Sequence, residues 1–184
     1  LDFTIDPKTW SVLKVLVPNI GKVSAERIQT ELVKLLVSDH PEYFSLIYES
    51  GMTDVFLREF SIMMETPQNN RHHWHTVGEH TLLALPKVRA DRILRLAMLF
   101  HDVGKPDCRT TDQYGTDHFA RHPDVGAEMT KDILRRLKFD TDTIQRVCRL
   151  VLIHDRRPQL TRHAVRRALS KNGIDCYPDF FAIH

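Results

Sequence analysis

The stretch that decides the fold is "LRLAMLFHDVGKPDCRTTD", residues 94–112. It opens with apolar side chains at almost every position, which predicts a helix that is buried on nearly all sides. His101 and Asp102 follow at the end of that helix. A buried charge is costly unless it is paired with another charge or bound to a metal. The stretch therefore predicts that this pair has a partner elsewhere in the chain.

Length and composition limit the classes of protein to consider. The 184 residues suffice for one domain with a sizeable core, or for a small domain with an additional helical layer. The three cysteines are scattered without CxxC spacing, which argues against a disulfide framework and a thiolate zinc site. No run is long and apolar enough to span a bilayer, and the N-terminus lacks a secretory pattern. We expect a cytoplasmic protein with no membrane contact.

Helical periodicity runs through almost the whole chain, and no segment alternates convincingly as a strand does. The polar, turn-rich segment "ETPQNNRHHWHT", residues 65–76, predicts a boundary. We therefore predict an all-α fold, with a small helical neck or body layer in residues 1–66 and a helical bundle in residues 67–184. Helices are expected in the bundle near residues 76–85, 91–101, 123–138, 141–154 and 161–171.

Charge is distributed unevenly along the chain. The net charge is +2, but residues 1–66 carry 6 Lys and Arg against 10 Asp and Glu, whereas residues 67–184 carry 20 against 14. Residues 131–171 alone carry 12 against 4. Solvated helix faces explain such a pattern in the simplest way, yet a basic cluster also suits a polyanionic ligand. We predict that a polyanionic ligand is bound by Arg156, Arg157, Arg166 and Arg167.

Histidine and aspartate recur at the ends of apolar helices and after a long loop. A single histidine on an apolar face is more often a hydrogen-bonded core residue than a ligand, so the argument rests on the whole set: His80, His101, Asp102, His122, His154 and Asp155. Imidazole and carboxylate ligands without thiolate suit a first-row transition ion or magnesium and leave positions open for water. The set predicts a divalent metal site, with Mg, Mn, Ni, Co, Fe and Zn all open.

Three more residues complete the predicted site and its surroundings. Gly104 lets the chain leave the helix without a Cβ penalty, and Lys105 is placed to neutralise a phosphate oxygen. The loop between residues 103 and 122 is long for a compact domain, and such loops are usually functional or disordered. His75, by contrast, belongs to the polar boundary segment, where a solvated loop histidine is the simpler interpretation.

The order of these residues resembles a known signature. His80, the pair His101-Asp102, and Asp155 resemble the H…HD…D signature of HD-domain metal-dependent phosphohydrolases, and "HDVGKP" is close to its HDIGKP form. Further segments, among them "VSAERIQTELVKLL", "HTVGEHTLLAL" and "HFARHPDVGAEM", resemble the neck, body and HD region of bacterial tRNA nucleotidyltransferases, the CCA-adding and poly(A) polymerase family. That family often has glycine where this chain has Arg121.

The resemblance implies a metal bound by His80, His101, Asp102 and Asp155, with Asp102, Lys105, His122 and His154 acting in catalysis. The implied reaction is hydrolysis of nucleotide phosphomonoesters or 2′,3′-cyclic phosphodiesters, or of an RNA 3′-end phosphate. His122 and His154 are alternatively ligands of a second ion.

The other open interpretation is a tRNA-binding body with a vestigial HD site. The Gly-Ser motif and paired carboxylates of the family's polymerising domain do not appear in this sequence. The resemblance therefore implies a C-terminal fragment or a stand-alone relative that cannot add nucleotides.

Overall fold

A computed structural model describes residues 4–69 and 75–155 of the chain. The elements of the N-terminal part are α1 (Pro7–Leu16), η1 (Val17–Lys22), α2 (Ala25–Leu36), η2 (Pro41–Tyr43), α3 (Phe44–Glu49), α4 (Thr53–Phe56) and α5 (Arg58–Glu65). They are followed by α6 (Val77–Ala84), η3 (Leu85–Lys87), α7 (Arg92–Phe100), α8 (Lys105–Cys108), β1 (Thr110–Thr111), β2 (Asp117–His118), α9 (His122–Arg136) and α10 (Thr141–Ile153). The predicted all-α class is confirmed. The helix expected near residues 161–171 and the four arginines lie outside the described residues.

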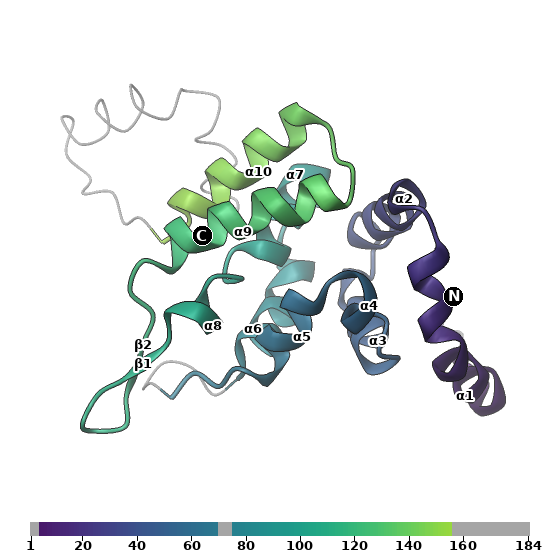
Figure 1. The fold of residues 1–184 in the computed structure, drawn as a ribbon, viewed down its shortest axis with the longest axis horizontal. Coiled ribbons are helices and arrows are strands. Elements are labelled where there is room, and N and C mark those ends of the chain that lie inside the picture. The colour runs from purple at the N-terminus through teal and green to yellow at the C-terminus, as the bar shows by residue number, and fades with distance from the viewer. Residues whose placement is uncertain (1–3, 70–74, 156–184) are drawn as a thin grey trace.

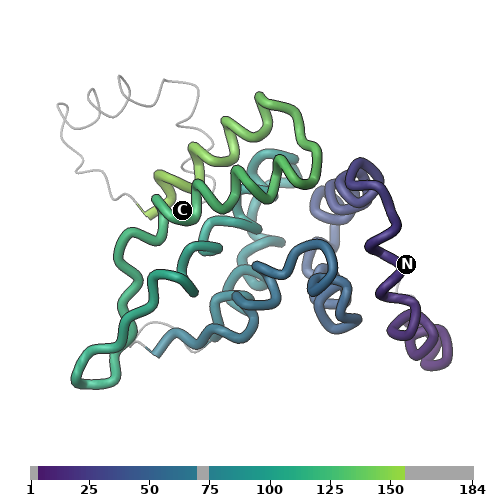
Figure 2. The backbone as a smooth tube through the Cα atoms, viewed as in Figure 1, coloured from purple at the N-terminus to yellow at the C-terminus, as the bar shows by residue number. Residues whose placement is uncertain are grey.

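Helix α7 is the centre of the bundle. It packs against α10, against α6 and against α2 of the N-terminal part (Figures 1 and 2). Every residue from Ile93 to Phe100 is buried, including the charged Arg95. The prediction of a helix that is buried on nearly all sides is confirmed.

Side-chain caps fix where the helices around the site begin. Asp91 accepts hydrogen bonds from the backbone N–H groups of Ile93 and Leu94 at the start of α7. Thr76 and Glu79 form a reciprocal capping box at the start of α6. Such caps satisfy N–H groups that have no partner inside the helix, so they set the helix register and with it the position of each site residue.

The long segment between α7 and α9 contains the one sheet in the described residues. β1 and β2 are antiparallel, with Thr110 opposite His118 and Thr111 opposite Asp117. No sequence pattern indicates these strands, because two residues are too few for alternation to be visible. The hairpin projects from the edge of the bundle (Figure 1).

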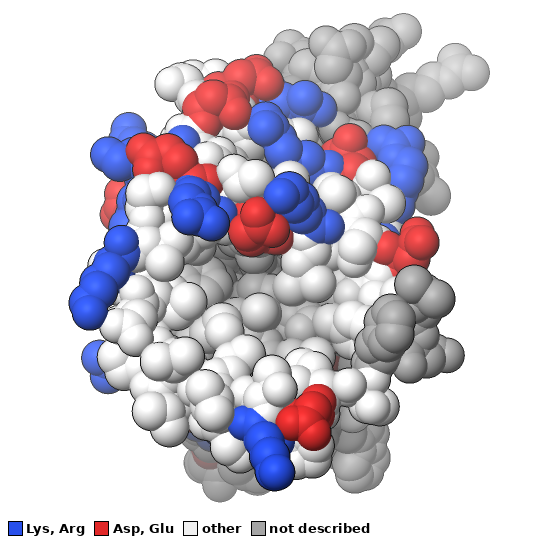
Figure 3. Space-filling model, turned by 90° about the vertical axis from the view of Figure 1, so that its right-hand side faces the viewer, with Lys and Arg blue, Asp and Glu red and all other residues white. Residues whose placement is uncertain are grey.

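The N-terminal part is built more loosely than the bundle. α1 buries none of its residues, and an apolar cavity of about 290 Å³ lies between η1, α2, α3 and α4. Seen from that side, the face is mostly uncharged and hollowed near its centre, with charged side chains gathered above the hollow (Figure 3). The division at residue 66 stays a prediction, because α5 and α6 pack closely across it. No helix in the described part of the chain is long and apolar enough to cross a membrane.

Candidate metal centre

Asp102 lies at the centre of a cluster of histidines. Its side chain is almost fully buried. Its Oδ2 lies 3.0 Å from Nε2 of His101 and 2.8 Å from Nζ of Lys105. Its Oδ1 lies 3.4 Å from Nε2 of His122 and 3.5 Å from Nε2 of His154. One carboxylate thus faces three imidazole rings, which come from the ends of α7, α9 and α10.

The three rings share one hydrogen-bonding arrangement. Nδ1 of each ring lies 2.7–2.8 Å from the backbone carbonyl three residues earlier: His101 on Met98, His122 on Phe119 and His154 on Val151. A carbonyl oxygen only accepts, so Nδ1 carries the proton in each ring. In the neutral rings the lone pair is then on Nε2, the atom that faces Asp102. This is the tautomer in which protein histidines present Nε2 to a metal.

In the neutral form of the rings, the Nε2 atoms and the carboxylate oxygens of Asp102 are all hydrogen-bond acceptors, yet they lie close together. Nε2 of His122 lies 3.2 Å from Nε2 of His154, and buried Oδ2 of Asp102 has the Lys105 ammonium at 2.8 Å but no well-directed hydrogen bond. Neutral imidazole nitrogens and a carboxylate repel one another unless a cation or a proton lies between them. Two ligands bonded to one ion at about 2.1 Å and at roughly right angles lie about 3.0–3.2 Å apart. The cluster therefore fits a divalent cation.

The acid–base properties of the cluster agree with that fit. Burial raises the pKa of Asp102, but the positive charge of a protonated His101, hydrogen bonds from the His101 and His154 rings and the charge of Lys105 outweigh it and hold the pKa well below its ordinary value. A cation bound between the rings and the carboxylate would stabilise the ionised form in the same way. Burial lowers the pKa of His122, and the nearby Asp102 carboxylate offsets this only in part. The carboxylate is thus ionised and His122 is neutral near pH 7, the states that metal ligands require.

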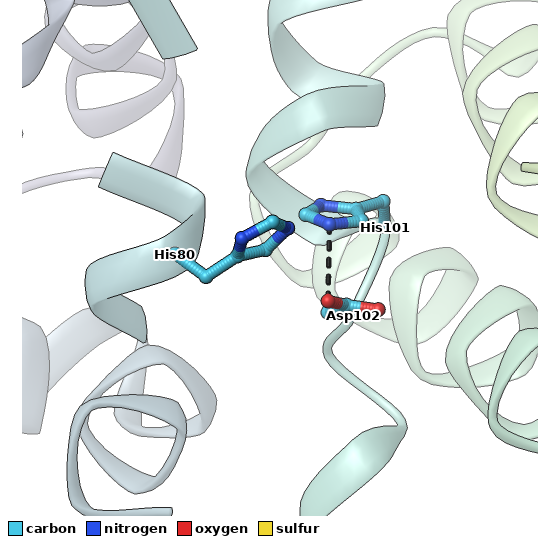
Figure 4. Close-up of side chains that lie close together, drawn as sticks. All are labelled: His80, His101 and Asp102. Carbon is cyan, nitrogen blue, oxygen red and sulfur yellow. Dashed lines mark ion pairs between the residues drawn. The ribbon is translucent and has the colours of Figure 1, made fainter. Parts of the chain in front are cut away.

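Two groups of ligand atoms are close enough together to hold an ion. One consists of His80, His101 and Asp102, and the other of Asp102, His122 and His154. His80 extends from α6 toward His101 and Asp102 (Figure 4), and its ring centroid lies 5.4 Å from that of His101. Asp102 belongs to both groups, with Oδ2 toward the first and Oδ1 toward the second.

Gly104 brings α9 into contact with the turn after α7. A Cβ added to Gly104 would lie 2.4 Å from the carbonyl oxygen of His122 and 2.5 Å from the backbone nitrogen of Gly126. Its φ of −82° is accessible to any residue, so the expectation that glycine serves the backbone conformation here is wrong. Glycine is needed because the two backbones touch, and this contact places His122 beside Asp102.

The structure brings most of the predicted site residues together. His80, His101, Asp102, His122 and His154 form the two groups, and Lys105 lies against Asp102. Asp155 is exposed and belongs to neither group, so its role as a ligand stays a prediction. Sequence reasoning missed Gln68, whose Oε1 accepts a hydrogen bond of 2.8 Å from Nζ of Lys105. No sequence signal connects two residues so far apart.

Comparison with known families agrees with this arrangement. The profile of the HD domain matches residues 71–176, which include every residue of both ligand groups. The chain belongs to the HD domain family. A second profile, described as the probable RNA- and SrmB-binding site of polymerase A, matches residues 2–63.

Several tRNA nucleotidyltransferases are similar to this HD-domain chain. A CC-adding tRNA nucleotidyltransferase of Thermus thermophilus is 36% identical over 84% of the chain and 37% of its own length. An A-adding tRNA nucleotidyltransferase of Deinococcus radiodurans is 34% identical over 84% of the chain and 38% of its own length. A CCA-adding enzyme of Blochmanniella pennsylvanica is 25% identical over 75% of the chain and 35% of its own length. The chain thus spans less than two fifths of these relatives.

Proposed function

We propose that this HD domain is a metal-dependent phosphohydrolase acting on nucleotide-type phosphomonoesters or 2′,3′-cyclic phosphodiesters. The observation that supports the proposal is the set of three Nε2 atoms turned toward one buried carboxylate. Hydrogen-bonded core histidines would direct a proton at the carboxylate instead, and the Nδ1 contacts argue against that arrangement for neutral rings.

The residues suggest where divalent ions would bind. His80, His101 and Oδ2 of Asp102 would hold one ion, with Asp155 as a further predicted ligand. Oδ1 of Asp102, His122 and His154 offer ligands for a second. A bound divalent ion would supply a water of lowered pKa that is nucleophilic at neutral pH. Asp102 would then contribute a carboxylate oxygen to each position.

Lys105 has the contacts expected of a group that binds phosphate. Its largely buried side chain places Nζ 2.8 Å from Asp102 Oδ2, 2.8 Å from Gln68 Oε1 and 5.4 Å from the centre of the Phe119 ring. A metal at Oδ2 would compete with Lys105 for that oxygen. We propose that the ammonium group then turns to a phosphate oxygen of the substrate, whose charge it stabilises.

Metal analysis together with activity measurements tests the proposal. The purified protein should retain a divalent metal and hydrolyse nucleoside monophosphates or 2′,3′-cyclic nucleotides when supplied with manganese, nickel, cobalt or magnesium. Asp102→Asn removes the carboxylate charge at nearly constant volume, so it should abolish both metal retention and hydrolysis.

Asp132→Asn is the control for metal retention, because Asp132 is an exposed aspartate of α9 outside both ligand groups. It should retain metal as the unaltered protein does. Undiminished hydrolysis by metal-free Asp102→Asn protein would place the chemistry elsewhere.

A second candidate function is tRNA binding, with the HD site inactive. It is favoured by the match of residues 2–63 to an RNA-binding profile and by the tRNA nucleotidyltransferase relatives. Addition of nucleotides would then require a nucleotidyltransferase domain, whose Gly-Ser motif and paired carboxylates this sequence does not contain. In this case tRNA binding should weaken steeply with salt, and neutral replacements of Arg156, Arg157, Arg166 and Arg167 should flatten the slope. His101→Ala should leave such binding almost unchanged.

A further inference from the structure

The tip of the β1–β2 hairpin carries an aromatic ring that the site as described does not use. Tyr114 is 83% exposed, the most exposed large hydrophobic side chain in the described part of the chain. We propose that Tyr114 is a stacking surface for a base of single-stranded RNA whose 3′-terminal phosphate occupies the Asp102 cluster. This inference rests on the proposed phosphohydrolase function and narrows its substrate to the end of an RNA strand.

Hydrogen bonds from Asp112 fix the hairpin tip. Its Oδ1 accepts from the backbone N–H groups of Tyr114 at 2.8 Å and Thr116 at 3.0 Å. Its Oδ2 lies 3.0 Å from Nε2 of His118 on β2. Gly115, with a φ of +78°, allows the turn that these bonds close. Tyr114 is therefore exposed on an ordered tip, which loses little conformational entropy when a ligand binds.

The base of the hairpin is anchored by a buried carboxylate. Asp117 accepts hydrogen bonds from Thr111 Oγ1 at 2.7 Å and from the backbone N–H of Asn69 at 3.0 Å. It also forms an ion pair of 3.0 Å with Nε of Arg109. The neighbouring Gln68 binds Lys105, so the hairpin and the site share one supporting segment. The backbone of the hairpin tip, which carries Tyr114, is thus anchored relative to the metal cluster.

Both ends of the hairpin lead directly into the site. The chain enters it from α8, which begins at Lys105, and leaves it through Phe119, whose carbonyl accepts the Nδ1 proton of His122. Helical residues advance about 1.5 Å each and strand residues about 3.3 Å, so Tyr114 lies at most about 20–25 Å from Lys105. A single-stranded RNA of a few nucleotides is long enough to span that distance.

The chemistry of the hairpin favours a base over a phosphate backbone. Between Lys105 and His122 the chain carries three Lys and Arg and three Asp, so there is no excess of positive charge. The exposed strand residues Thr110 and Thr111 are neutral hydrogen-bonding groups. Stacking on aromatic rings is the usual way in which proteins hold bases of single-stranded RNA, and a duplex would hide those base faces.

Binding of short oligoribonucleotides of two lengths tests the proposal. The probes are a fluorescein-labelled dinucleotide and hexanucleotide, each ending in a 3′-phosphonate that cannot be hydrolysed, with the whole protein and manganese. The hexanucleotide should bind about tenfold more tightly than the dinucleotide, as expected for one stacked base. Tyr114→Ala should remove that gain, whereas Tyr114→Phe, which keeps the ring, should retain it.

Equal affinity for the two lengths, or an unchanged hexanucleotide Kd in Tyr114→Ala, would overturn the proposal. The binding assay needs no turnover, so it is independent of whether the protein hydrolyses phosphoesters. Hydrolysis of a 3′-phosphorylated hexanucleotide by the unaltered protein is measured separately. If that hydrolysis is absent while Tyr114-dependent binding is present, the phosphohydrolase function fails and the stacking surface stands.

Discussion

The Asp102 cluster differs from the N-terminal layer, which consists of α1 to α4, in the side chains that each buries and exposes. Around Asp102 the molecule buries charged and ionisable groups against one another. In the N-terminal layer it leaves apolar side chains in solvent, with Val12, Val15 and Leu16 of α1 more than half exposed. Helix α7 is buried along almost its whole length, and α1 buries no residue.

This difference shows that buried ionisable groups restrict the surrounding backbone more than exposed apolar side chains do. A buried ionisable group costs free energy unless its partners are positioned to about 1 Å, so the backbone around Asp102 tolerates little change. An exposed apolar side chain needs no partner, so the surroundings of α1 tolerate much more. Substitutions of one type should therefore have very different effects in the two regions.

The largest contrast is expected for glycine-to-alanine substitutions. Gly104→Ala inserts a Cβ 2.4–2.5 Å from backbone atoms of His122 and Gly126, which must move apart. We expect it to lower the free energy of unfolding by about 3 kcal/mol, the upper range for overpacking, and to weaken metal retention. Urea unfolding and metal analysis measure the two effects.

Gly21→Ala is the matched control in the N-terminal part. Its Cβ would meet only Val55, at 3.8 Å, an ordinary contact distance. We expect a change within about 0.5 kcal/mol and no effect on metal. Similar destabilisation by the two substitutions would contradict the difference in backbone packing between the regions.

The second prediction concerns the buried arginine that joins the two regions. Arg95 of α7 donates to the carbonyl of Leu36, at the end of α2, and to that of Arg89. Arg95→Met leaves both carbonyls without these donors, and this loss should outweigh the relief of burying one charge less. We expect a loss of about 2 kcal/mol in urea unfolding, with faster amide exchange in α2.

Arg92→Met, on the same helix, is the control for loss of an arginine. Arg92 is partly exposed and pairs with Asp140 at 3.0 Å. A pair of this kind contributes at most about 1 kcal/mol, so its loss should leave exchange in α2 unchanged. Equal rates of amide exchange in α2 of the two variants would show that Arg95 does not hold α2 against α7.

The features that sequence predicted well are those whose cause lies within a few residues. The apolar run before His101 fixes a fully buried helix, and Asp91 and Thr76 mark helix starts by local capping. The cluster of histidines around Asp102 was also expected, because ionisable residues at the ends of apolar helices need a partner. The recurrence of these patterns made a metal site a reasonable hypothesis before any distance was known.

The features that sequence could not predict depend on contacts between distant segments. Gly104 is needed for its approach to Gly126, and nothing in the sequence near it indicates that contact. The bond between Lys105 and Gln68 joins two segments 37 residues apart. The strands of the hairpin are too short to produce a pattern. In each case the cause is tertiary packing, which local periodicity does not encode.

A third and smaller effect is expected at the two ends of α9, where non-glycine residues adopt left-handed backbone conformations. Arg121 has a φ of 65° and Lys138 a φ of 61°. Glycine adopts this conformation without a Cβ penalty, so Arg121→Gly and Lys138→Gly should each raise the free energy of unfolding by about 0.5–1 kcal/mol. The resemblance to a family with glycine before the histidine indicates an unusual backbone conformation at Arg121. No sequence feature indicates one at Lys138.

Arg135→Gly is the control within α9 for the two glycine substitutions. Arg135 lies in the last turn of the helix, where glycine should cost about 1 kcal/mol. Stabilisation at Lys138 but not at Arg121 would show that the turn before His122 is held by other contacts.

The smallest effect is a dependence on pH at the start of α10. Hydrogen bonds from the Thr143 hydroxyl and backbone N–H, with the nearby Arg92, lower the pKa of Asp140 to about 2. The unfolded chain, with an ordinary pKa near 4, therefore binds this proton first as the pH falls. The stability that Asp140 contributes is present above about pH 4 and is lost between about pH 4 and pH 2.

Asp140→Asn cannot titrate, so its Tm should lie below that of the unaltered protein at pH 7, and the gap should narrow as the pH falls through that window. Asp6→Asn is the matched control, since Asp6 caps α1 in the same way but α1 buries no residue. Fraying of α1 should leave the rest of the fold intact, so the Asp6 gap should be small at every pH. A Tm difference for Asp140→Asn that stays constant down to pH 2 would mean that the charge of the cap contributes nothing. A Tm difference for Asp6→Asn as large as that for Asp140→Asn would mean that α1 is coupled to the bundle despite its exposure.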